Sequence, residues 1–513
     1  MPMSLYLQDS TSFEFLRNYL RAAGFLKTPI CRRLGIQELN ELLSPRPGRV
    51  TLTDESDELG FLIRLFIFGE SFETEEMGSV FPARVLKALT DLGLLREEGG
   101  DRHRLSSPVS LYPVGDLFIV SDHWSAPGDS GYREDFVFPA ITPHTSQFLA
   151  ALPLTPCEAF LELCSGAAAA ALAASSYAQH AWAIDITARS TEMAKFNRLL
   201  NGCDNVTVLK GDLYEGVGDV TFDRIVAHPP YMPVLRPAQI FYDGGADGEQ
   251  ITRRIVEALP RFLKPGGCFY CSAQGSDRKG ASLEQRVRGW LGEGQSDFDV
   301  AVVEKRGQDP EQAALIYGMK SKGGGQAARL MREMLSELDI ECMVYGWIII
   351  KRFRDMRKGF TVRRLAGPRM GRDELAWLLC WESFAAGPSA AEEFQHMIPV
   401  ANASLELRTI HRLKDGNLAP DTFSLHTETP FKMDCRVDPW VGFLIPHCDG
   451  QSTVLQLFEI CKTKHLIHPE APLAEFIQLL MVLVSGGFLE VGDFGLPAHD
   501  AEAGALPPAQ HHL

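Results

Sequence analysis

The tetrad His228-Pro229-Pro230-Tyr231 combines three kinds of group that could hold a reacting molecule. A neutral histidine offers one acceptor nitrogen and takes up a proton near pH 7, so His228 could orient a donor or act as a base. The two prolines lack N–H groups and keep the preceding residue extended, which makes the tetrad rigid. Tyr231 could stack on a planar group. The alternative is a histidine that only packs at the end of a strand.

A second pattern places small residues directly after an apolar segment. Residues 158–163 predict a strand, and Cys164-Ser165-Gly166 leads into the alanine run 167–171. Small side chains let the backbone approach a ligand at the carboxyl end of a strand. Gly166 is the single glycine of this turn, so a plain strand-to-helix turn is also compatible with the pattern.

An acidic residue ends the next predicted strand, 181–186. Asp185 stands about 20 residues beyond the small-residue turn, where an acid can bind both hydroxyls of a ribose. Two further apolar segments follow at 206–209 and 222–227, with helical patterns between the segments. Strands that alternate with helices predict an α/β fold with a parallel, doubly wound sheet.

In this order, the motifs resemble those of class I methyltransferases that use S-adenosyl-L-methionine (SAM) to methylate nitrogen. The tetrad is similar to their (N/D)PP(Y/F) signature, with His228 in place of Asn or Asp. The segment Tyr242-Asp-Gly-Gly-Ala-Asp-Gly248 resembles one in release-factor glutamine methyltransferases, and Leu263-Lys-Pro-Gly-Gly267 precedes a fifth strand. The resemblance covers 130–275 well and 276–365 loosely. It implies a Rossmann-like core with a mostly parallel, seven-stranded sheet.

The resemblance also implies roles for individual residues. Asp185 would bind the ribose hydroxyls of SAM, and Asp212 would lie against the adenine amino group. The expected cofactor-binding residues are Glu162, Cys164, Gly166, Asp185, Ile186, Asp212, Leu213 and His228. The expected catalytic residues, which would form the methyl-acceptor site, are His228, Pro229, Pro230 and Tyr231. The expected substrate-pocket residues are His144, Thr145, Tyr242 and Asp243, with loop packing as the alternative for the first two.

The expected activity is methyl transfer to a nitrogen of a small metabolite, or of a peptide held by the flanking modules. In the family, an Asn oxygen and a proline carbonyl accept hydrogen bonds from the substrate amino group and aim its lone pair at the methyl. His228 leaves an amine, a ring nitrogen or an oxygen open as the acceptor atom. Alternatives are a protein glutamine N-methyltransferase and a non-catalytic, SAM-sensing scaffold that binds DNA or a partner.

Helical patterns flank the core on both sides. A strand, a glycine turn and a strand are predicted over 94–105, and an amphipathic helix over 473–484 resembles part of the PqqD-like winged helices that hold peptides. The expected parts are a winged-helix-like module at 1–108, the methyltransferase domain at 109–366, a second winged-helix-like module at 367–496 and a disordered tail at 497–513. Two such modules are compatible with a homodimer.

An insert of helical character is expected at 306–341, between two apolar strands that usually form a tight hairpin in this fold. It would cap the acceptor site or form a surface helical pair. A basic cluster follows the second strand, and we favour a solvated strand edge over a surface for acidic substrates or nucleic acid. Its members are Lys351, Arg352, Arg354, Arg357, Lys358, Arg363 and Arg364.

Composition narrows the class of protein. The 513 residues contain 50 Lys and Arg against 66 Asp and Glu, a net charge of −16, which argues against nucleic acid as a general partner. Hydrophobic residues make up 45%, as in globular proteins with large cores. Neither a signal-peptide pattern nor a membrane-spanning run is present in the sequence, so a cytoplasmic location without membrane contact is expected.

The 11 cysteines are scattered and predict buried thiols in a reducing compartment. Cys268 and Cys271 have the spacing of a metal or redox pair, but they lie in a predicted strand whose alternation points them to opposite faces. We therefore expect no metal.

Overall fold

The computed structural model describes residues 5–8, 10–43, 52, 56–98, 101–124, 133–235, 240–321, 323–354 and 357–494. The tail predicted at 497–513 lies outside these residues. The chain divides into two compact units: unit 1 comprises 1–149 and 154–273, and unit 2 comprises 150–153 and 274–513. The expected domain boundaries stay predictions. None of the helices in the described residues is long and apolar enough to span a membrane.

The N-terminal part of unit 1 consists of short helices followed by two hairpins. Its helices are α1 (Ser10–Ala22), α2 (Lys27–Leu34), the 3-10 helix η1 (Leu39–Leu43), α3 (Glu58–Phe66), α4 (Thr74–Val80) and α5 (Ala83–Asp91). Its strands are β1 (Phe72–Glu73), β2 (Arg96–Glu98), β3 (Asp101–Ser106), β4 (Ser110–Val114) and β5 (Leu117–Ser121). Strands β2 and β3 pair antiparallel, so the hairpin predicted over 94–105 is confirmed. The β4–β5 hairpin was not predicted, and the winged-helix assignment stays a prediction.

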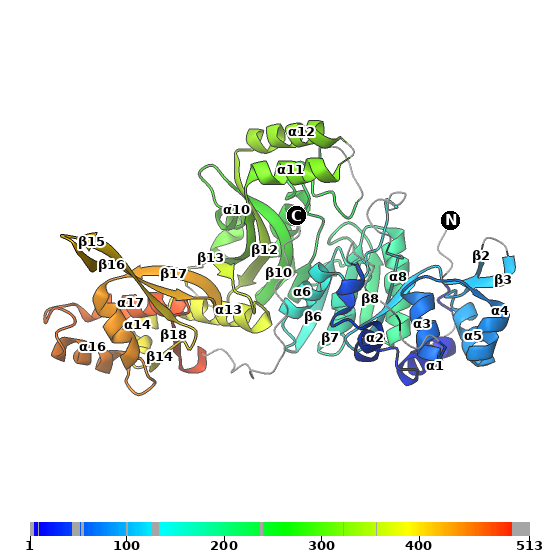
Figure 1. Ribbon diagram of the computed structural model, residues 1–513, viewed down its shortest axis with the longest axis horizontal. Helices are drawn as coiled ribbons and strands as arrows, with labels where there is room; N and C mark the ends of the chain where they lie inside the picture. Colours follow the sequence, from blue (N-terminus) through cyan, green and yellow to red (C-terminus); the bar gives the residue numbers. More distant parts are fainter. Residues whose placement is uncertain are drawn as a thin grey trace. The chain divides into compact units, whose positions relative to one another are not determined.

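The remainder of unit 1 is a parallel sheet with helices packed on it (Figure 1). The strands are β6 (Cys157–Leu163), β7 (Ala178–Asp185), β8 (Val206–Lys210), β9 (Phe222–Ala227) and the first part of β10 (Leu263–Arg278). The helices are α6 (Pro143–Ala151), α7 (Ala169–Ala174), α8 (Ala188–Asn201) and α9 (Gln250–Phe262). The strand order is β10-β9-β6-β7-β8, and every neighbouring pair is parallel. This confirms the doubly wound prediction and places the switch point between β6 and β9.

The sequence forms this sheet because its central strands are apolar on both faces. From Ala159 to Leu163, β6 is buried throughout, and β9 is buried from Arg224 to Ala227. Strands covered by helices on both faces need such continuous apolar runs. The alanines of α7 are almost all buried, so their small side chains let this helix pack closely against β6 and β7.

Helix α8 binds the edge of β5 through two asparagines one turn apart. Asn197 accepts a hydrogen bond from the Val120 N–H at 2.8 Å and donates to the carbonyls of Val120 and Ala167 at 3.3 and 3.1 Å. Asn201 bonds the N–H and the carbonyl of Phe118, both at 2.8 Å. The two side-chain amides thus satisfy backbone groups on the edge of β5 as a neighbouring strand would.

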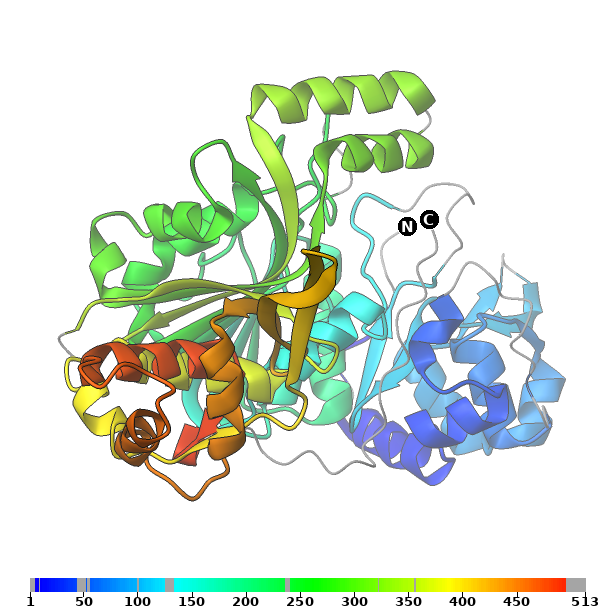
Figure 2. The ribbon, with the colours of Figure 1, turned by 60° about the vertical axis from the view of Figure 1, so that its left-hand side comes forward.

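Unit 2 contains a mixed set of strands and most of the remaining helices (Figure 2). Its strands are the end of β10, β11 (Phe298–Gln308), β12 (Ile340–Arg352), β13 (Thr361–Ala366), β14 (Pro399–Ala401), β15 (Glu406–Lys414), β16 (Asn417–Thr427), β17 (Phe431–Val437) and β18 (Leu489–Val491). Its helices are α10 (Leu283–Trp290), α11 (Pro310–Lys320), α12 (Gly324–Glu337), α13 (Arg372–Ala385), α14 (Ala390–Phe394), α15 (Pro439–Leu444), α16 (Val454–Thr463) and α17 (Leu473–Ser485), with 3-10 helices η2 (Gly292–Asp297), η3 (Ile445–His447) and η4 (Gly492–Phe494).

The strand order in unit 2 is β10-β12-β11-β13-β17-β16-β15, with β14 and β18 paired separately. The prediction of seven strands was therefore an undercount, because β13, β17, β16 and β15 extend the series. Strands β11 and β12 form the expected antiparallel pair. Helices α11 and α12 lie between these two strands in the sequence and pack against each other. The helical character predicted for the insert is therefore confirmed.

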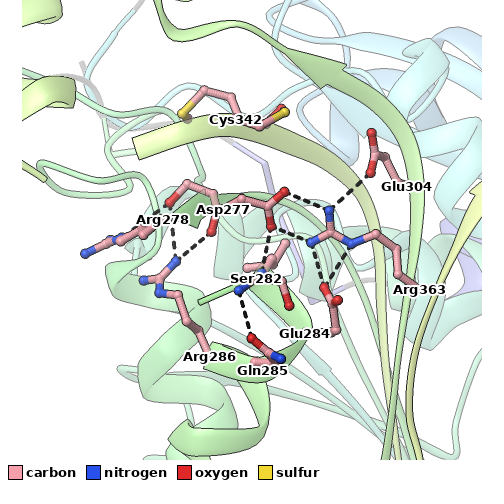
Figure 3. Close-up of polar contacts among 12 residues, drawn as sticks. Asp277, Arg278, Ser282, Glu284, Gln285, Arg286, Glu304, Cys342 and Arg363 are labelled. Atoms are coloured by element: carbon pink, nitrogen blue, oxygen red, sulfur yellow. Dashed lines mark hydrogen bonds and ion pairs between the residues drawn. The ribbon is translucent and has the colours of Figure 1, made fainter. Parts of the chain in front are cut away.

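One arginine of the predicted basic cluster lies among three carboxylates (Figure 3). Arg363 contacts Asp277 at 2.8 Å, Glu284 at 2.9 Å and Glu304 at 3.4 Å. The side chains of all four residues are at most 21% exposed. Burial raises the pKa of Glu304, whereas the positive charge of Arg363 acts to lower this pKa. The guanidinium therefore serves as a crosslink between β13, β10, α10 and β11.

Two further arginines of the cluster are also paired inside unit 2. Arg357 bonds Asp299, with side chains 8% and 0% exposed, and Arg364 bonds Glu382, with side chains 13% and 10% exposed. For these arginines and Arg363, both sequence-based interpretations were wrong: the side chains neither form a solvated edge nor present free positive charge. Buried charges require partners, and each of these has a carboxylate within reach.

The asparagine pair generates a stability prediction. We expect Asn197→Ala to lower the free energy of unfolding by about 2–4 kcal/mol, because three buried backbone groups lose their partner. Lys195→Ala changes an exposed residue of the same helix and is expected to stay within about 0.5 kcal/mol. Urea denaturation of both variants measures the difference, and equal midpoints would refute the role given to Asn197.

Candidate active site

The loop after β6 follows a left-handed backbone path at three positions. Cys164, Gly166 and Ala168 have φ angles of 54°, 51° and 64°. Such angles favour glycine, so Cys164 and Ala168 adopt the path at some conformational cost. A Cβ atom added at Gly166 would meet no atom of the described residues within 4 Å, which leaves open space among them beside this glycine. The loop therefore retains a shape that a ligand can approach, although two of its residues carry side chains.

The carboxylate of Asp185 connects this loop to the start of α8. Its Oδ2 accepts a hydrogen bond from the Gly166 N–H at 2.9 Å. Its Oδ1 accepts from the N–H and the hydroxyl of Thr187 at 3.0 and 3.1 Å. A carboxylate has about four acceptor positions, so these three bonds leave about one for a further donor. Asp185 thus holds the loop and keeps limited capacity for a ribose hydroxyl.

Glu162 lies buried beneath the first turn of α7. Its oxygens accept hydrogen bonds from the N–H groups of Ala170 and Ala171 at 3.3 and 2.7 Å. Burial raises the pKa of Glu162 to about 8, although these two bonds favour the ionised form. A cationic ligand nearby would lower this pKa, because opposite charge stabilises the carboxylate. A positively charged ligand therefore suits this carboxyl.

The hydroxyl of Ser165 is buried and has no hydrogen-bond partner among the described residues. Buried polar groups are normally paired, so this hydroxyl can serve a ligand. Together with the open space at Gly166, the acceptor on Asp185 and the buried Glu162, it fits SAM, which carries ribose hydroxyls and positive charge. The site was not fully anticipated: Ser165 and Thr187 were overlooked, although a threonine between a strand-end acid and a helix is a typical N-cap.

Three more of the expected cofactor residues follow β7 and β8. Ile186 is 47% exposed next to Asp185, and Leu213 is buried with a φ of 54°. The Asp212 carboxylate accepts a hydrogen bond from Arg254 of α9 at 2.8 Å. The role expected for Asp212 at the adenine stays a prediction, and Arg254 competes for the same oxygen.

The tetrad begins directly after β9, across the switch point from β6. The His228 ring lies beside two aromatic rings, with centroid distances of 5.5 Å to Phe148 and 6.0 Å to Tyr231. Burial, together with the nearby charge of His144, lowers the pKa of His228 to about 4. The imidazole is therefore neutral at pH 7, which leaves one ring nitrogen free to accept a hydrogen bond.

The glycine-rich segment 242–248 fixes the backbone that follows the tetrad. Met232 bonds the Tyr242 carbonyl through its N–H at 3.0 Å and accepts from the Gly244 N–H at 3.0 Å. A Cβ atom at Gly248 would lie 2.5 Å from the Tyr231 carbonyl oxygen, and φ is 76° there. Only glycine allows this approach, so Gly248 positions Tyr231.

The expected substrate-pocket residues lie in two places in unit 1. His144 is exposed near the start of α6, close enough for its charge to affect His228, while the Thr145 hydroxyl bonds Thr142 at 2.8 Å. Tyr242 is 41% exposed and packs against Phe241 at a centroid distance of 4.7 Å.

Asp243 accepts a hydrogen bond from the Gly245 N–H at 3.0 Å, which stabilises the glycine segment. A substrate role for this residue and for the other three expected pocket residues stays a prediction. In the described part of the chain, the His, Cys, Asp and Glu side chains form no group of three that could hold a metal ion.

Comparison with known proteins identifies two regions of the sequence. Residues 141–290 match the family model of the methyltransferase small domain, and residues 40–105 match a domain of unknown function, DUF7059. The chain is 35% identical over 130 residues to the ribosomal protein uL3 glutamine methyltransferase of Bradyrhizobium diazoefficiens, covering 23% of this chain and 41% of that protein. It is 34% identical over 122 residues to the release factor glutamine methyltransferase of Geobacter sulfurreducens, covering 21% and 43%.

The chain thus spans less than half the length of these curated relatives. The matched region contains the loop after β6, Asp185 and the tetrad, and its parallel sheet has its switch point at these residues. Residues 141–290 are therefore a class I, SAM-dependent methyltransferase domain of the methyltransferase small type.

Proposed function

We propose that this protein methylates the side-chain amide nitrogen of a glutamine in a protein acceptor. The observation that carries the proposal is the neutral His228 imidazole, which lies beside the rings of Phe148 and Tyr231 at the end of β9. It replaces the acceptor oxygen of Asn in the related signature with an acceptor nitrogen. The similarity to two glutamine methyltransferases supports the same substrate class.

Four residues would hold SAM. Gly166 gives close backbone access, Asp185 accepts from a ribose hydroxyl, and Ser165 offers its unpaired hydroxyl. Glu162 would become ionised beside positive charge, because the pKa of this carboxyl is raised to about 8 in its absence. When bound, SAM supplies an electrophilic methyl group on a sulfonium sulfur.

The tetrad would orient the acceptor amide. The neutral His228 nitrogen and the Pro229 carbonyl would accept hydrogen bonds from the amide NH₂, directing its nitrogen toward the methyl group. Tyr231 would stack on the planar amide. As the new N–C bond forms and the S–C bond breaks, the amide nitrogen loses a proton. Water can take up this proton, because an N-protonated amide is a far stronger acid than hydronium, so the step needs no protein base.

The small-metabolite acceptor expected from the sequence is less well supported than this protein acceptor. Both relatives act on proteins of translation, by their names, and a similar acceptor would place this activity in the cytoplasm. The role of His228 as a base active near pH 7 is also not supported, because the pKa of His228 is lowered to about 4. A His228 nitrogen that only accepts a hydrogen bond from the amide N–H does not need to titrate near pH 7.

The acceptor can be identified by labelling. The purified protein and radiolabelled SAM are incubated with host lysate that has been separated into small-molecule, protein and nucleic-acid fractions. We expect label in the protein fraction only, and mass spectrometry of the labelled peptide should place one added methyl on glutamine. The His228→Ala variant provides the background. Label confined to small molecules or nucleic acid would contradict the proposal.

Substitution of Asp185 tests the cofactor site. In Asp185→Asn the shape is kept, but the amide NH₂ must face at least one N–H donor, from Gly166 or Thr187. We expect SAM to bind about 10- to 150-fold more weakly, as loss of a hydrogen bond to a charged group costs about 1.5–3 kcal/mol. Isothermal titration calorimetry measures this change. Asp219→Asn, at a carboxylate that is 96% exposed, should leave the affinity unchanged.

Substitution of His228 separates acceptor and base roles. We expect His228→Asn to keep transfer within about tenfold of wild type and His228→Ala to lose about 100-fold, both with normal SAM affinity. Because the pKa of His228 is about 4, the imidazole stays neutral as pH falls from 8 to 6. With SAM saturating, so that Glu162 stays ionised beside it, the wild-type kcat/KM for the acceptor should therefore be constant over this range and fall only near pH 4. An inflection near pH 6.5 that His228→Asn abolishes would establish the base role instead.

A further inference from the structure

Strand β15 forms an open edge in unit 2. It is the last strand of its series, and all nine of its residues are exposed. A two-residue turn, Asp415-Gly416, joins it to β16 with φ angles of 51° and 80°, as in the tight turns that favour Asp-Gly. Figure 1 labels this β15–β16 ribbon. Exposed edge strands are usually interrupted by proline or a bulge. The register of the β15–β16 pair shifts near Ile410, but the extra residue, Asp421, lies on β16, so β15 itself is regular and contains no proline.

The sequence of β15 is nearly symmetric about Ile410. It reads Glu406-Leu-Arg-Thr-Ile-His-Arg-Leu-Lys414, in which Leu-Arg-Thr and His-Arg-Leu mirror each other around the isoleucine. The apolar members Leu407, Ile410 and Leu413 are 46%, 55% and 71% exposed. An ordinary exposed edge strand has no reason to be symmetric, whereas a strand that pairs with itself antiparallel places each residue opposite its mirror position.

We propose that two copies of this chain pair antiparallel along β15, with Ile410 facing Ile410 at the two-fold axis. Leu407 then lies opposite Leu413 twice, which covers four exposed apolar side chains. Glu406 lies opposite Lys414 twice, so two pairs of opposite charge flank the centre. Directly opposite side chains in antiparallel strands lie close enough to interact, and both kinds of pair are favourable.

The same register places Arg408 opposite Arg412. Each arginine already has a carboxylate on its own chain: Arg408 bonds Glu406 at 2.8 Å, and Arg412 bonds Asp421 at 2.8 Å. These carboxylates reduce the repulsion between the two guanidinium groups. In addition, Glu406 reaches the Arg412 of the other copy along the diagonal, two residues from the directly opposite position.

The symmetry favours a second copy over an unrelated strand as the occupant, because a different partner would not require the mirror arrangement of charges. A pair of nine-residue strands covers fewer residues than the 20–30 per side of a standard stable interface. We therefore expect a concentration-dependent dimer, with dissociation in the range of about 10–100 µM.

A charge-swap experiment on the full chain tests the proposal. Glu406→Lys places lysine opposite lysine, and Lys414→Glu places glutamate opposite glutamate. Sedimentation equilibrium from about 1 to 200 µM should show a dissociation constant raised at least about tenfold for each single variant. An equimolar mixture of the two variants restores both opposite-charge pairs and should form heterodimers. The double variant should dimerise like the wild type, and it carries both local changes, so it controls for damage to the hairpin.

Three outcomes would overturn the proposal. The first is a wild-type protein that stays monomeric at 200 µM, even if the open edge then binds a peptide strand of another protein. The second is a wild-type dimer that both single variants retain, which would place the interface elsewhere. The third is a mixture of the single variants that remains monomeric. None of these outcomes bears on methyl transfer, because the substitutions lie outside the residues assigned to the acceptor and SAM.

Discussion

The carboxylate of Asp185 joins three segments that must meet for a SAM site to exist. It ends β7, bonds the backbone of the loop after β6 through Gly166, and bonds the start of α8 through Thr187. The sheet brings these segments together because parallel strands end at the same edge. Loss of this one group would leave the partly buried Gly166 N–H without this partner and release the loop. The cofactor contacts proposed for Ser165 and Glu162 depend on the same loop.

The loop also shows why glycine content alone is a poor guide to function. Cys164 and Ala168 occupy positions with left-handed backbone, so the path survives without glycine at either position. With Gly166 as the single glycine of the turn, the sequence was also compatible with a plain strand-to-helix turn. The preserved path, the buried Glu162 and the open space at Gly166 support a working cofactor site instead. What is lost is conformational ease, at a cost of about 1–2 kcal/mol per strained residue.

The environment of His228 changes its chemistry from what its residue type suggests. An exposed histidine titrates near neutral pH, but burial beside Phe148 and Tyr231 holds the pKa of His228 near 4. An imidazole that is neutral at pH 7 can accept a hydrogen bond from an amide NH₂ group, as an asparagine side-chain oxygen does. The environment also decides the role of two arginines in unit 2. Arg357 and Arg363 belong to a basic cluster in the sequence, but carboxylates around them neutralise their charge, so they present no free positive surface.

The sequence by itself determined which segments form the parallel strands, together with the turn at Gly166, the strand-end Asp185 and the rigid tetrad. Each of these depends on a local pattern of apolar, small or cyclic side chains. Tertiary structure decided the rest. The bond from Gly166 to Asp185 and the pairing of Arg363 with three carboxylates join residues that are distant in sequence, and the neutral state of His228 depends on burial. The extra strands of unit 2 were missed for a related reason: β15 is exposed along its whole length, so it lacks the alternation of buried and exposed residues by which a half-buried strand is recognised.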